Sequence, residues 1–323
     1  MHKFKLSAAA MLIAVGLVPA QALAEYPDRP IKLVVGFSPG GNTDVMARIV
    51  AQKMSAVMGQ PVVVENKTGA GGVIATDVVS KSTADGYTLL FGTSSYPISA
   101  SLYKNLPYDP VTAVIPISLV AVVPLVLVVN PKVPAKTAKE FVDLVRKSPG
   151  KYNYGSAGNG SAVHMAVELL KYQEKLDTVH VPFRGAGPAA PALMAGQVQF
   201  MIDAISTTAP NIKSGRLNAL AVTTSERSKV FPDVPTMKEA GFPDYTSSIW
   251  NMVFAPNGTP PAVIAKVAEA VKEVMKDPEL QQRYIDMGVQ MPADTSAAFA
   301  AKFVQEERDR WATVVKAGGI VVQ

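Results

Sequence analysis

The sequence predicts an α/β protein that folds into two lobes with a ligand cleft between them. The chain has 323 residues, of which 48% are hydrophobic and only 18% charged, so it can bury two cores. Apolar strands alternate with amphipathic helices, a pattern typical of parallel sheets with right-handed crossovers. Helical stretches close the chain after a second such unit, so we expect them to return and pack on the first lobe.

The first 24 residues have the pattern of a secretory signal peptide. A short positive start with Lys3 and Lys5 precedes an apolar run over residues 6–18, and Ala22-Leu23-Ala24 forms a cleavage site of the A-x-A type. The apolar run is too short for the roughly 20 residues that cross a bilayer. We therefore expect cleavage after Ala24 and export of the mature protein.

The mature chain begins with a first α/β unit. We expect strands over residues 31–35, 62–65 and 87–91, and helices over residues 44–58 and 73–81. Loops rich in glycine and hydroxyl residues follow the first and third strands. If the strands lie in the order 2-1-3, these two loops meet at the switch point where ligands bind in open α/β sheets.

A second unit follows with the same alternation. Strands are predicted over residues 125–129, 152–155, 178–181, 199–203 and 219–223, and helices over residues 138–147, 161–171 and 188–194. Prolines then punctuate the chain before three final helical stretches near residues 261–276, 278–287 and 296–317. We expect crossings between the lobes near residues 116–124 and 223–225, and we read Trp250 as a hinge or core aromatic residue.

Composition excludes several functional classes. The chain has no cysteine and only three histidines, so thiol catalysis, disulfides and Cys/His metal clusters are excluded, and we expect no cofactor and no metal. The formal net charge is +5, but the basic residues are scattered and only 7% of residues are aromatic. We therefore expect no binding of nucleic acid.

Three loops favour recognition of an anion. Residues 37–43, 156–160 and 184–187 each follow a strand and lead into a helix. Free N–H groups at a helix N-terminus bind carboxylate or phosphate, and glycine lets the backbone approach the ligand. A glycine turn with a capping residue is also common in purely structural loops, so the presence of such loops in both units is the stronger observation.

An alternative is a serine esterase. Gly36-Phe37-Ser38-Pro39-Gly40 matches the G-x-S-x-G nucleophile elbow. Pro39, however, has no N–H to donate to an oxyanion, and the only histidines that could serve as base are in the second unit. We therefore do not expect an enzyme.

Four side chains near these loops have both structural and functional readings. Asp44 could stabilise a helix N-terminus or contact the ligand. His164 could face the cleft or pack inside. Arg184 could pair with a carboxylate or lie on the surface, and Asp203 could hold a ligand amine, a water molecule or Arg184.

The chain resembles the Bug/TctC family, the periplasmic solute receptors of tripartite tricarboxylate transporters. The matching segments span the mature chain in order and include residues 26–35, 39–44, 65–72, 84–90, 155–161, 181–185, 196–198, 220–223 and 234–241. Two departures concern Ala113-Val114, where the family usually has Asp-Phe, and Gly36, where it usually has a proline that would stiffen the loop.

The resemblance implies a type II periplasmic-binding-protein fold that closes on a small solute and passes it to membrane permease subunits. It implies one lobe from residues 25–120 plus 226–323 and a second from residues 121–225. We expect a monomer that binds a small organic carboxylate or an amino-acid-like solute; a ligand sensor for a membrane signalling partner would share this chemistry. The candidate ligand-binding residues are Phe37, Ser38, Gly40, Gly41, Asn42, Thr43, Asp44, Ser94, Ser156, Ala157, Gly158, Gly160, Ser161, His164, Arg184, Gly185 and Asp203.

Overall fold

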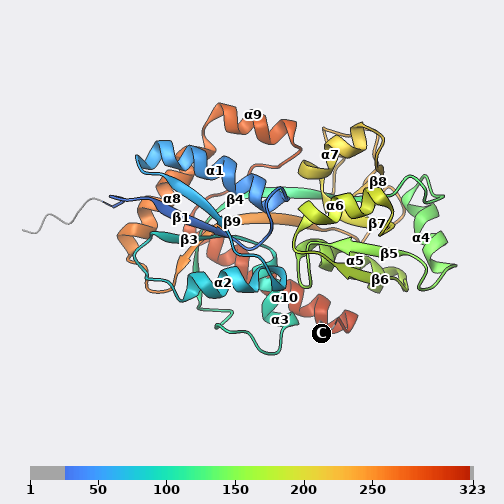
Figure 1. Cartoon of the computed structure of the whole chain (residues 1–323), viewed down its shortest axis with the longest axis horizontal. Coiled ribbons are helices and arrows are strands. Elements are labelled where there is room, and N and C mark those ends of the chain that lie inside the picture. The colour runs from blue at the N-terminus through green and yellow to red at the C-terminus, as the bar shows by residue number, and fades with distance from the viewer. Residues whose placement is uncertain (1–25, 321–323) are drawn as a thin grey trace, which may run out of the picture.

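A computed structural model describes residues 26–320 of the chain, so the predicted signal segment lies outside the described residues. Figure 1 shows an elongated molecule in which the strands and helices of residues 31–93 lie toward one end and those of residues 138–222 lie toward the other. We call these ends the first and the second lobe. Their strands form one nine-stranded sheet.

The first lobe is built on three parallel strands in the predicted order 2-1-3. β1 (Ile31–Val35) lies between β2 (Val62–Asn66) and β3 (Thr88–Thr93) and is parallel to both. The helices of this part are α1 (Asn42–Met58), the 3-10 turn η1 (Ala70–Gly72), α2 (Val73–Ser80) and α3 (Ser95–Leu102). The α1 helix begins two residues earlier than predicted, and α3 was not predicted.

Strand β4 (Val114–Val129) connects the lobes and corrects one prediction. We predicted a strand over residues 125–129 only, but the strand is continuous over 16 residues and includes Pro116 and Pro124. Up to Pro124 its strand partner is β9 (Ser248–Pro256), with one isolated bridge from Val122 to Gln290 on the other side. From Leu125 it pairs with β7 (Phe200–Ala204) and β8 (Asn218–Val222). Where a strand has a neighbour on only one side, a proline can be placed where its missing N–H removes no ladder hydrogen bond.

The second lobe follows the predicted order of elements. Its strands are β5 (Asn153–Ser156), β6 (Val179–Pro182), β7 (Phe200–Ala204) and β8 (Asn218–Val222). Its helices are α4 (Ala138–Arg146), α5 (Ala162–Glu174), α6 (Ala186–Ala195) and α7 (Ile205–Lys213), of which α7 was not predicted. β5 is parallel to β6 and β7 and lies between them, while β4 is antiparallel to β7 and β8.

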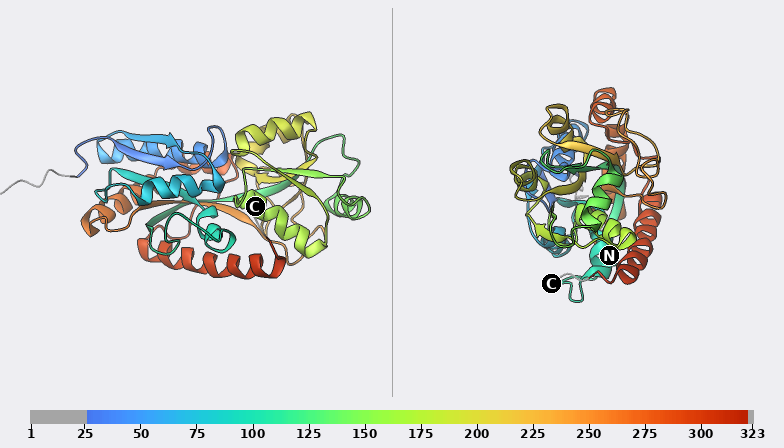
Figure 2. Two further views of the ribbon diagram at one scale, coloured as in Figure 1. Left: turned by 60° about the horizontal axis from the view of Figure 1, so that its bottom comes forward. Right: turned by 90° about the vertical axis from the view of Figure 1, so that its right-hand side faces the viewer.

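The chain then returns to the first lobe through β9 (Ser248–Pro256), a strand that was not predicted from the sequence. β9 lies between β3 and β4 and is antiparallel to both. Three helices follow: α8 (Pro261–Met275), α9 (Pro278–Asp286) and α10 (Ala297–Gly318). Figure 2 shows α10 along one long side of the molecule, where it packs on α3 and β4 and reaches α5 of the second lobe. The predicted return of the terminal helices is confirmed.

The junction between the lobes is packed rather than open. Trp250 is 1% exposed on β9, and its Nε1 donates to Glu307 of α10 at 2.9 Å, which confirms the reading of this residue as a core aromatic. The Thr223 hydroxyl donates to the carbonyl of Ser247 (2.6 Å) and accepts from the N–H of Leu125 (3.2 Å), so it joins three segments at the crossing. Within residues 26–320, no helix is both long and apolar enough to cross a membrane.

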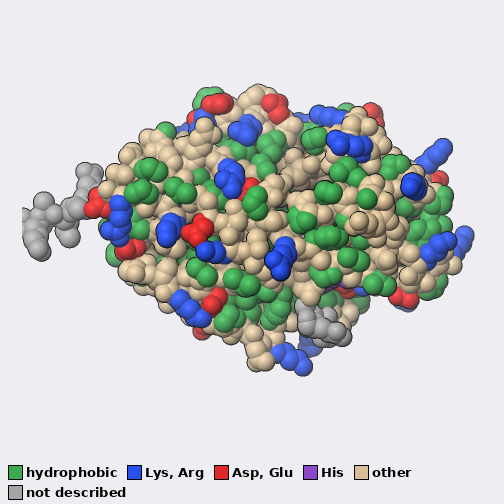
Figure 3. Space-filling view, viewed as in Figure 1, with side chains coloured by type: hydrophobic (Ala, Val, Ile, Leu, Met, Phe, Trp, Pro, Cys, Tyr) green, Lys and Arg blue, Asp and Glu red, His purple; other side chains and the backbone are tan. Residues whose placement is uncertain are grey.

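The face of the molecule in Figure 3 carries lysine and arginine side chains spread among polar and apolar ones.

Candidate functional site

A cavity of about 30 Å³ lies between the lobes, at the ends of the strands where the sequence placed the site. It is lined from the first lobe by a loop and helix start (residues 37–43), by the end of β3 and by β9. From the second lobe it is lined by α5, α6 and β7. The lining residues are Phe37, Gly41, Asn42, Thr43, Thr93, Ser95, Ala157, Ser161, Ala162, Val163, Ala186, Asp203 and Ile249.

The starts of three long helices meet at this cavity. α1 begins at Asn42, α5 at Ala162 and α6 at Ala186, and all three residues line the cavity. The first N–H groups of an α-helix have no partner within the helix, and the helix dipole places partial positive charge there. The Thr43 hydroxyl lies beside them, whereas Ser161 Oγ caps α5 by accepting from the N–H of His164 (3.3 Å) and donates to the carbonyl of Gly158 (2.7 Å). The site therefore offers hydrogen-bond donors from both lobes to an anionic group.

The two lobes touch directly around the cavity. The N–H of Ser38 donates to the carbonyl of Arg184 (3.2 Å), and the Ser206 hydroxyl donates to Oδ1 of Asn42 (2.9 Å). At the other side, the Tyr103 hydroxyl donates to the carbonyl of Asn159 (3.0 Å). These bonds join residues that are between 56 and 164 positions apart in the chain. The structure is thus a closed form of the cleft.

Glycines allow this close approach. A Cβ atom on Gly71 would lie 2.2 Å from the carbonyl oxygen of Asn159, and one on Gly187 would lie 2.7 Å from the carbonyl oxygen of Pro39. Gly185 has φ of +146°, and a Cβ there would lie 2.3 Å from the Ser38 hydroxyl oxygen. Each contact crosses between the lobes. Gly36, where a looser loop was considered, packs instead against Gly72, because a Cβ atom on Gly36 would lie 2.7 Å from Gly72 Cα.

Asp44 supports the first loop rather than facing the cavity. Its carboxylate accepts hydrogen bonds from the N–H of Gly40 (3.0 Å), from Asn66 Nδ2 (2.9 Å) and from Arg48 Nε (3.0 Å). Burial acts to raise the pKa of Asp44, but these donors outweigh it and the pKa is lowered. Asn66 also donates to the carbonyl of Phe37 (2.9 Å). The carboxylate is thus occupied by protein donors that hold the loop in place.

Ser156 and His164 form hydrogen bonds that hold the loop after β5, residues 156–160, in place. The Ser156 hydroxyl accepts from the N–H of Gly158 (3.0 Å) and lies 2.5 Å from His180 Nε2. His164 Nδ1 accepts from the N–H of Gly160 (3.2 Å), and its ring stacks on that of His180 with 4.1 Å between centroids. Burial lowers the pKa of His164 to about 4 and that of His180 to about 3. Both rings are therefore neutral near pH 7.

Arg184 and Asp203 are not partners. Arg184 is exposed, and it lines a separate cavity of about 220 Å³ between residues 69–71 and 157–159, at the outer edge of the cleft. Asp203 is 1% exposed at the end of β7 and lines the inner cavity. Its Oδ1 accepts from the N–H of Ala204 at 2.8 Å, and burial raises its pKa to about 6.

The structure brings together part of the predicted set. Seven candidates line the inner cavity, namely Phe37, Gly41, Asn42, Thr43, Ala157, Ser161 and Asp203. The others lie behind the lining or between the lobes, except that Gly158 and Arg184 line the outer cavity and Gly40 is exposed to solvent.

Six lining residues are not among the predicted ligand-binding candidates: Thr93, Ser95, Ala162, Val163, Ala186 and Ile249. Thr93 and Ala186 nevertheless belong to loops that the sequence placed at the site. Ser94, which was predicted, is buried, while its neighbours Thr93 and Ser95 line the cavity. The run of three hydroxyl residues at 93–95 is the sequence pattern that could have indicated both lining residues.

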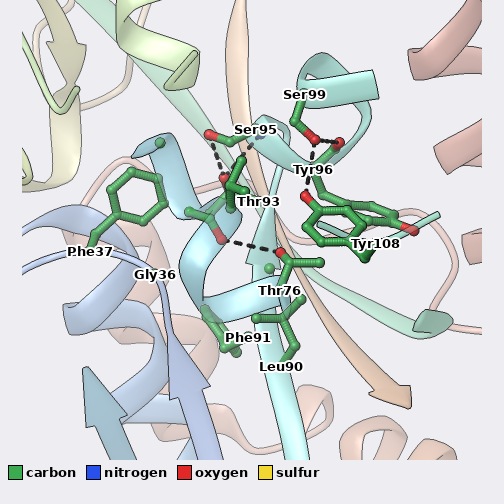
Figure 4. Close-up of a pocket in the computed structure, with 14 residues that line it drawn as sticks. Gly36, Phe37, Thr76, Leu90, Phe91, Thr93, Ser95, Tyr96, Ser99 and Tyr108 are labelled. Carbon is green, nitrogen blue, oxygen red and sulfur yellow. Dashed lines mark hydrogen bonds between the residues drawn. The ribbon is translucent and has the colours of Figure 1, made fainter. Parts of the chain in front are cut away.

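Figure 4 shows a second cavity of about 20 Å³ inside the first lobe, next to the cleft. Phe37 lies on one side of it and Tyr96 and Tyr108 on the other, with Thr93 and Ser95 between them. Phe37, Thr93 and Ser95 line both cavities. The N–H of Ser95 donates to the Thr93 hydroxyl (3.1 Å), which fixes these two side chains at the boundary.

Ser38 lacks the partners of a nucleophile. Its hydroxyl oxygen is buried and has no hydrogen-bond partner among the described residues. The two histidines of residues 26–320 stack on each other in the second lobe, where they support the loop after β5. In the same part of the chain, no three His, Asp or Glu side chains are grouped so as to hold a metal ion.

Two lobes that close on an inner cavity lined by helix starts and hydroxyl groups define a solute-binding protein. Residues 46–320 match the family described as the tripartite tricarboxylate transporter family receptor, TctC. The chain belongs to this family of solute-binding receptors, which are not enzymes as a class, and the resemblance drawn from the sequence is confirmed.

Known relatives agree over nearly the whole chain. BugT of Bordetella pertussis is 38% identical over 312 residues, which are 96% of this chain and 95% of BugT. The structure of the periplasmic binding protein BugD has a TM-score of 0.89 and 35% identity, and covers 92% of this chain and 100% of BugD. MatC of Rhodopseudomonas palustris, solved with bound malate, has a TM-score of 0.87 and 36% identity over 90% of this chain and 100% of MatC. These likenesses confirm the predicted two-lobed periplasmic-binding-protein fold.

Proposed function

We propose that this protein captures a small organic carboxylate between its lobes and delivers it to the membrane permease subunits of a tripartite tricarboxylate transporter. The observation that carries the proposal is the meeting of three helix starts, from both lobes, at one inner cavity. One helix start alone can bind an anion, but donors from both lobes reach the same carboxylate only when the lobes close around it. Membership of the receptor family and the bound malate of MatC support the same reading.

Uptake of the solute requires the lobes to separate. A water molecule needs about 10–15 Å³ of cavity volume, so a cavity of about 30 Å³ has room for only a few waters, and direct hydrogen bonds between the lobes lie around it. We propose a hinge at the crossing where Thr223 joins Leu125 and Ser247. In this proposal one lobe is formed by residues 25–120 plus 226–323 and the other by residues 121–225.

Binding without turnover is the expected chemistry. The Ser38 hydroxyl has no base within reach among residues 26–320, and Pro39, which follows it, cannot donate an N–H to an oxyanion. A carboxylate held by backbone N–H groups and hydroxyls undergoes no reaction that these groups would promote. We also propose that the protein is exported, that it is cleaved after Ala24, and that it acts as a monomer. The cleavage site lies outside the described residues.

The proposal is tested by thermal unfolding of residues 25–323 with a library of mono-, di- and tricarboxylates, amino acids and aromatic acids. A solute at 100 times its dissociation constant stabilises the protein by about 2.7 kcal/mol, a clear rise in the unfolding midpoint. Mass spectrometry of the same samples should recover the compound unchanged. Conversion of the compound, or stabilisation only by compounds without a carboxylate, would contradict the proposal.

A further inference from the structure

The positive charge of the described chain is concentrated in the second lobe. Residues 121–225 carry 11 Lys and Arg side chains against 6 Asp and Glu, whereas residues 26–120 and 226–320 together carry 18 against 19. These basic residues are scattered along the sequence, and the fold gathers most of those in the second lobe at one place. Figure 3 shows lysine and arginine side chains at the end of the molecule where Figure 1 labels α4.

The topology of the second lobe explains why these charges meet. β5, β6 and β7 are parallel, and the inner cavity lies where β5 and β7 end. At the opposite end of the lobe, the starts of β7 and β8 lie level with the end of β4, because Val129 pairs with both Phe200 and Asn218. We call the five connections there the far end of the second lobe: residues 130–137, 147–152, 175–178, 196–199 and 214–217.

The far end carries six cations and one acid, Asp177. All six cations are exposed, and none forms an ion pair within residues 26–320: Lys132, Lys136, Lys147, Lys151, Lys175 and Arg216. The ion pairs next to them belong to α4 instead. Asp143 pairs with Lys139 (2.9 Å) and Arg146 (2.8 Å). Arg146 also pairs with Glu174 (2.8 Å), so both of these carboxylates are already neutralised.

The corresponding end of the first lobe has no such excess of charge. The connections before β1, β2 and β3, residues 26–30, 59–61 and 81–87, carry two cations and two acids. Both cations are paired: Arg29 with Asp85 (3.0 Å) and Lys81 with Asp77 (2.6 Å). Unpaired basic charge is therefore a property of one end of the molecule and not of its surface in general.

The residue types at the far end suit an anionic lipid surface better than a protein. Five of the six cations are lysines, which act as point charges on flexible stems, whereas protein interfaces are poor in lysine and rich in aromatic residues and arginine. The one aromatic residue of the five connections, Tyr152, is buried and offers no anchor. Lysines close to a surface of anionic phospholipids strengthen binding by about fivefold each.

We propose that the far end of the second lobe binds the anionic phospholipid headgroups of a membrane. This inference goes beyond the proposed function and does not depend on which solute is bound. The inner cavity lies at the opposite ends of the same strands, so a membrane at the far end leaves the cleft uncovered. Such contact also holds the receptor beside the membrane that contains the proposed permease subunits.

The test is sedimentation of residues 25–323 with vesicles of phosphatidylcholine alone or with about 30% phosphatidylglycerol. Binding should require phosphatidylglycerol and should be lost in about 1 M NaCl, where the Debye length falls to about 3 Å. A variant that combines Lys147→Gln, Lys151→Gln and Lys175→Gln should bind about 100-fold more weakly, at about fivefold for each cation.

The matched control combines Lys32→Gln, Lys104→Gln and Lys266→Gln. These lysines are exposed in the first lobe and form no ion pair within residues 26–320, so the control has the same net charge as the far-end variant. It should bind the vesicles about as tightly as the original protein. Thermal unfolding midpoints should be alike in all three proteins, since only exposed side chains change.

Two results would overturn the inference: binding that does not depend on phosphatidylglycerol, or an equal loss in both triple variants, which would implicate overall charge. Poly-glutamate, titrated in place of vesicles, tests an acidic protein face as the partner. If it binds and phosphatidylglycerol vesicles do not, the membrane is the wrong partner. Solute binding should be unchanged in both variants, so failure of this inference leaves the carboxylate receptor standing.

Discussion

Gly187→Ala should separate closure of the lobes from their folding. Gly187 lies in the first turn of α6 in the second lobe, and its backbone is not in the left-handed region, so alanine fits its conformation. Within the helix alanine is the better residue by up to about 1 kcal/mol. The added methyl group, however, would lie 2.7 Å from the carbonyl oxygen of Pro39 in the first lobe. The overlap exists only when the cleft is closed.

The expected size of the effect follows from this geometry. Overpacking a tight contact costs about 1–3 kcal/mol. Because the cost falls on the closed form alone, it is subtracted directly from the binding free energy of any ligand that requires closure. A coupling of this size corresponds to an affinity lowered by about 5- to 150-fold. The unfolding midpoint without ligand should stay the same or rise slightly.

Calorimetric titration with the solute found by thermal screening measures the affinity, and small-angle scattering measures the fraction of closed molecules. Pro188→Ala is the matched control, because Pro188 is exposed in the same first turn of α6 and lines neither the inner nor the outer cavity. It should keep the affinity within a few-fold of the original. An unchanged affinity in Gly187→Ala would refute the view that this closed form is the ligand-binding form.

Three further substitutions test the electrostatics and chemistry of the site. Burial raises the pKa of Asp203 from 3.8 to about 6, so the ionised carboxylate destabilises the folded state increasingly as pH rises from about 4 to above 6. Asp203→Asn should therefore raise the free energy of unfolding, measured by urea unfolding, by about 3 kcal/mol at pH 7.5. The same measurement near pH 4 should show almost no gain. Burial lowers the pKa of His164 from 6.5 to about 4, so the contribution of the neutral ring to folding stability is fully present above about pH 6.5 and is lost as pH falls toward 4. His164→Asn keeps an acceptor for the N–H of Gly160 and should flatten the curve of stability against pH between about pH 4 and 6.5. Ser38→Ala removes a hydroxyl without a partner among the described residues and should change the binding free energy by less than about 0.5 kcal/mol, and a larger loss in titration would mean that Ser38 contacts the solute.

The local elements of the fold could be predicted from the sequence because their signals lie within a few residues. The β1–α1–β2 and β3 segments, and most of the second lobe, show the spacing of apolar residues and the glycine stops that define strands and helices. The helices α3 and α7 were missed because they are short and contain Pro97 and Pro210, which propensity alone disfavours.

The strands β9 and the first half of β4 depend on each other. Pro116 and Pro124 argue against a strand when the segment is read alone, but pairing with β9 supplies the hydrogen bonds that keep it extended. That partner is more than a hundred residues away along the chain, so no local pattern announces it. Sequence patterns therefore predicted the two units but not the long pair of strands that joins them.

The binding site, like the fold, was predicted from the sequence only in its local features. The sequence by itself determined that glycine- and hydroxyl-rich loops precede helices in both units, and hence that carboxylate recognition was the favoured chemistry. Only the tertiary structure decided which residues face the cavity: Thr93 and Ser95 rather than Ser94, and Asp203 apart from Arg184. Residue type and spacing determine local structure over a few positions. The direction of a side chain depends on how whole elements pack, as does the contact of Asn42 with Ser206, which is 164 positions away.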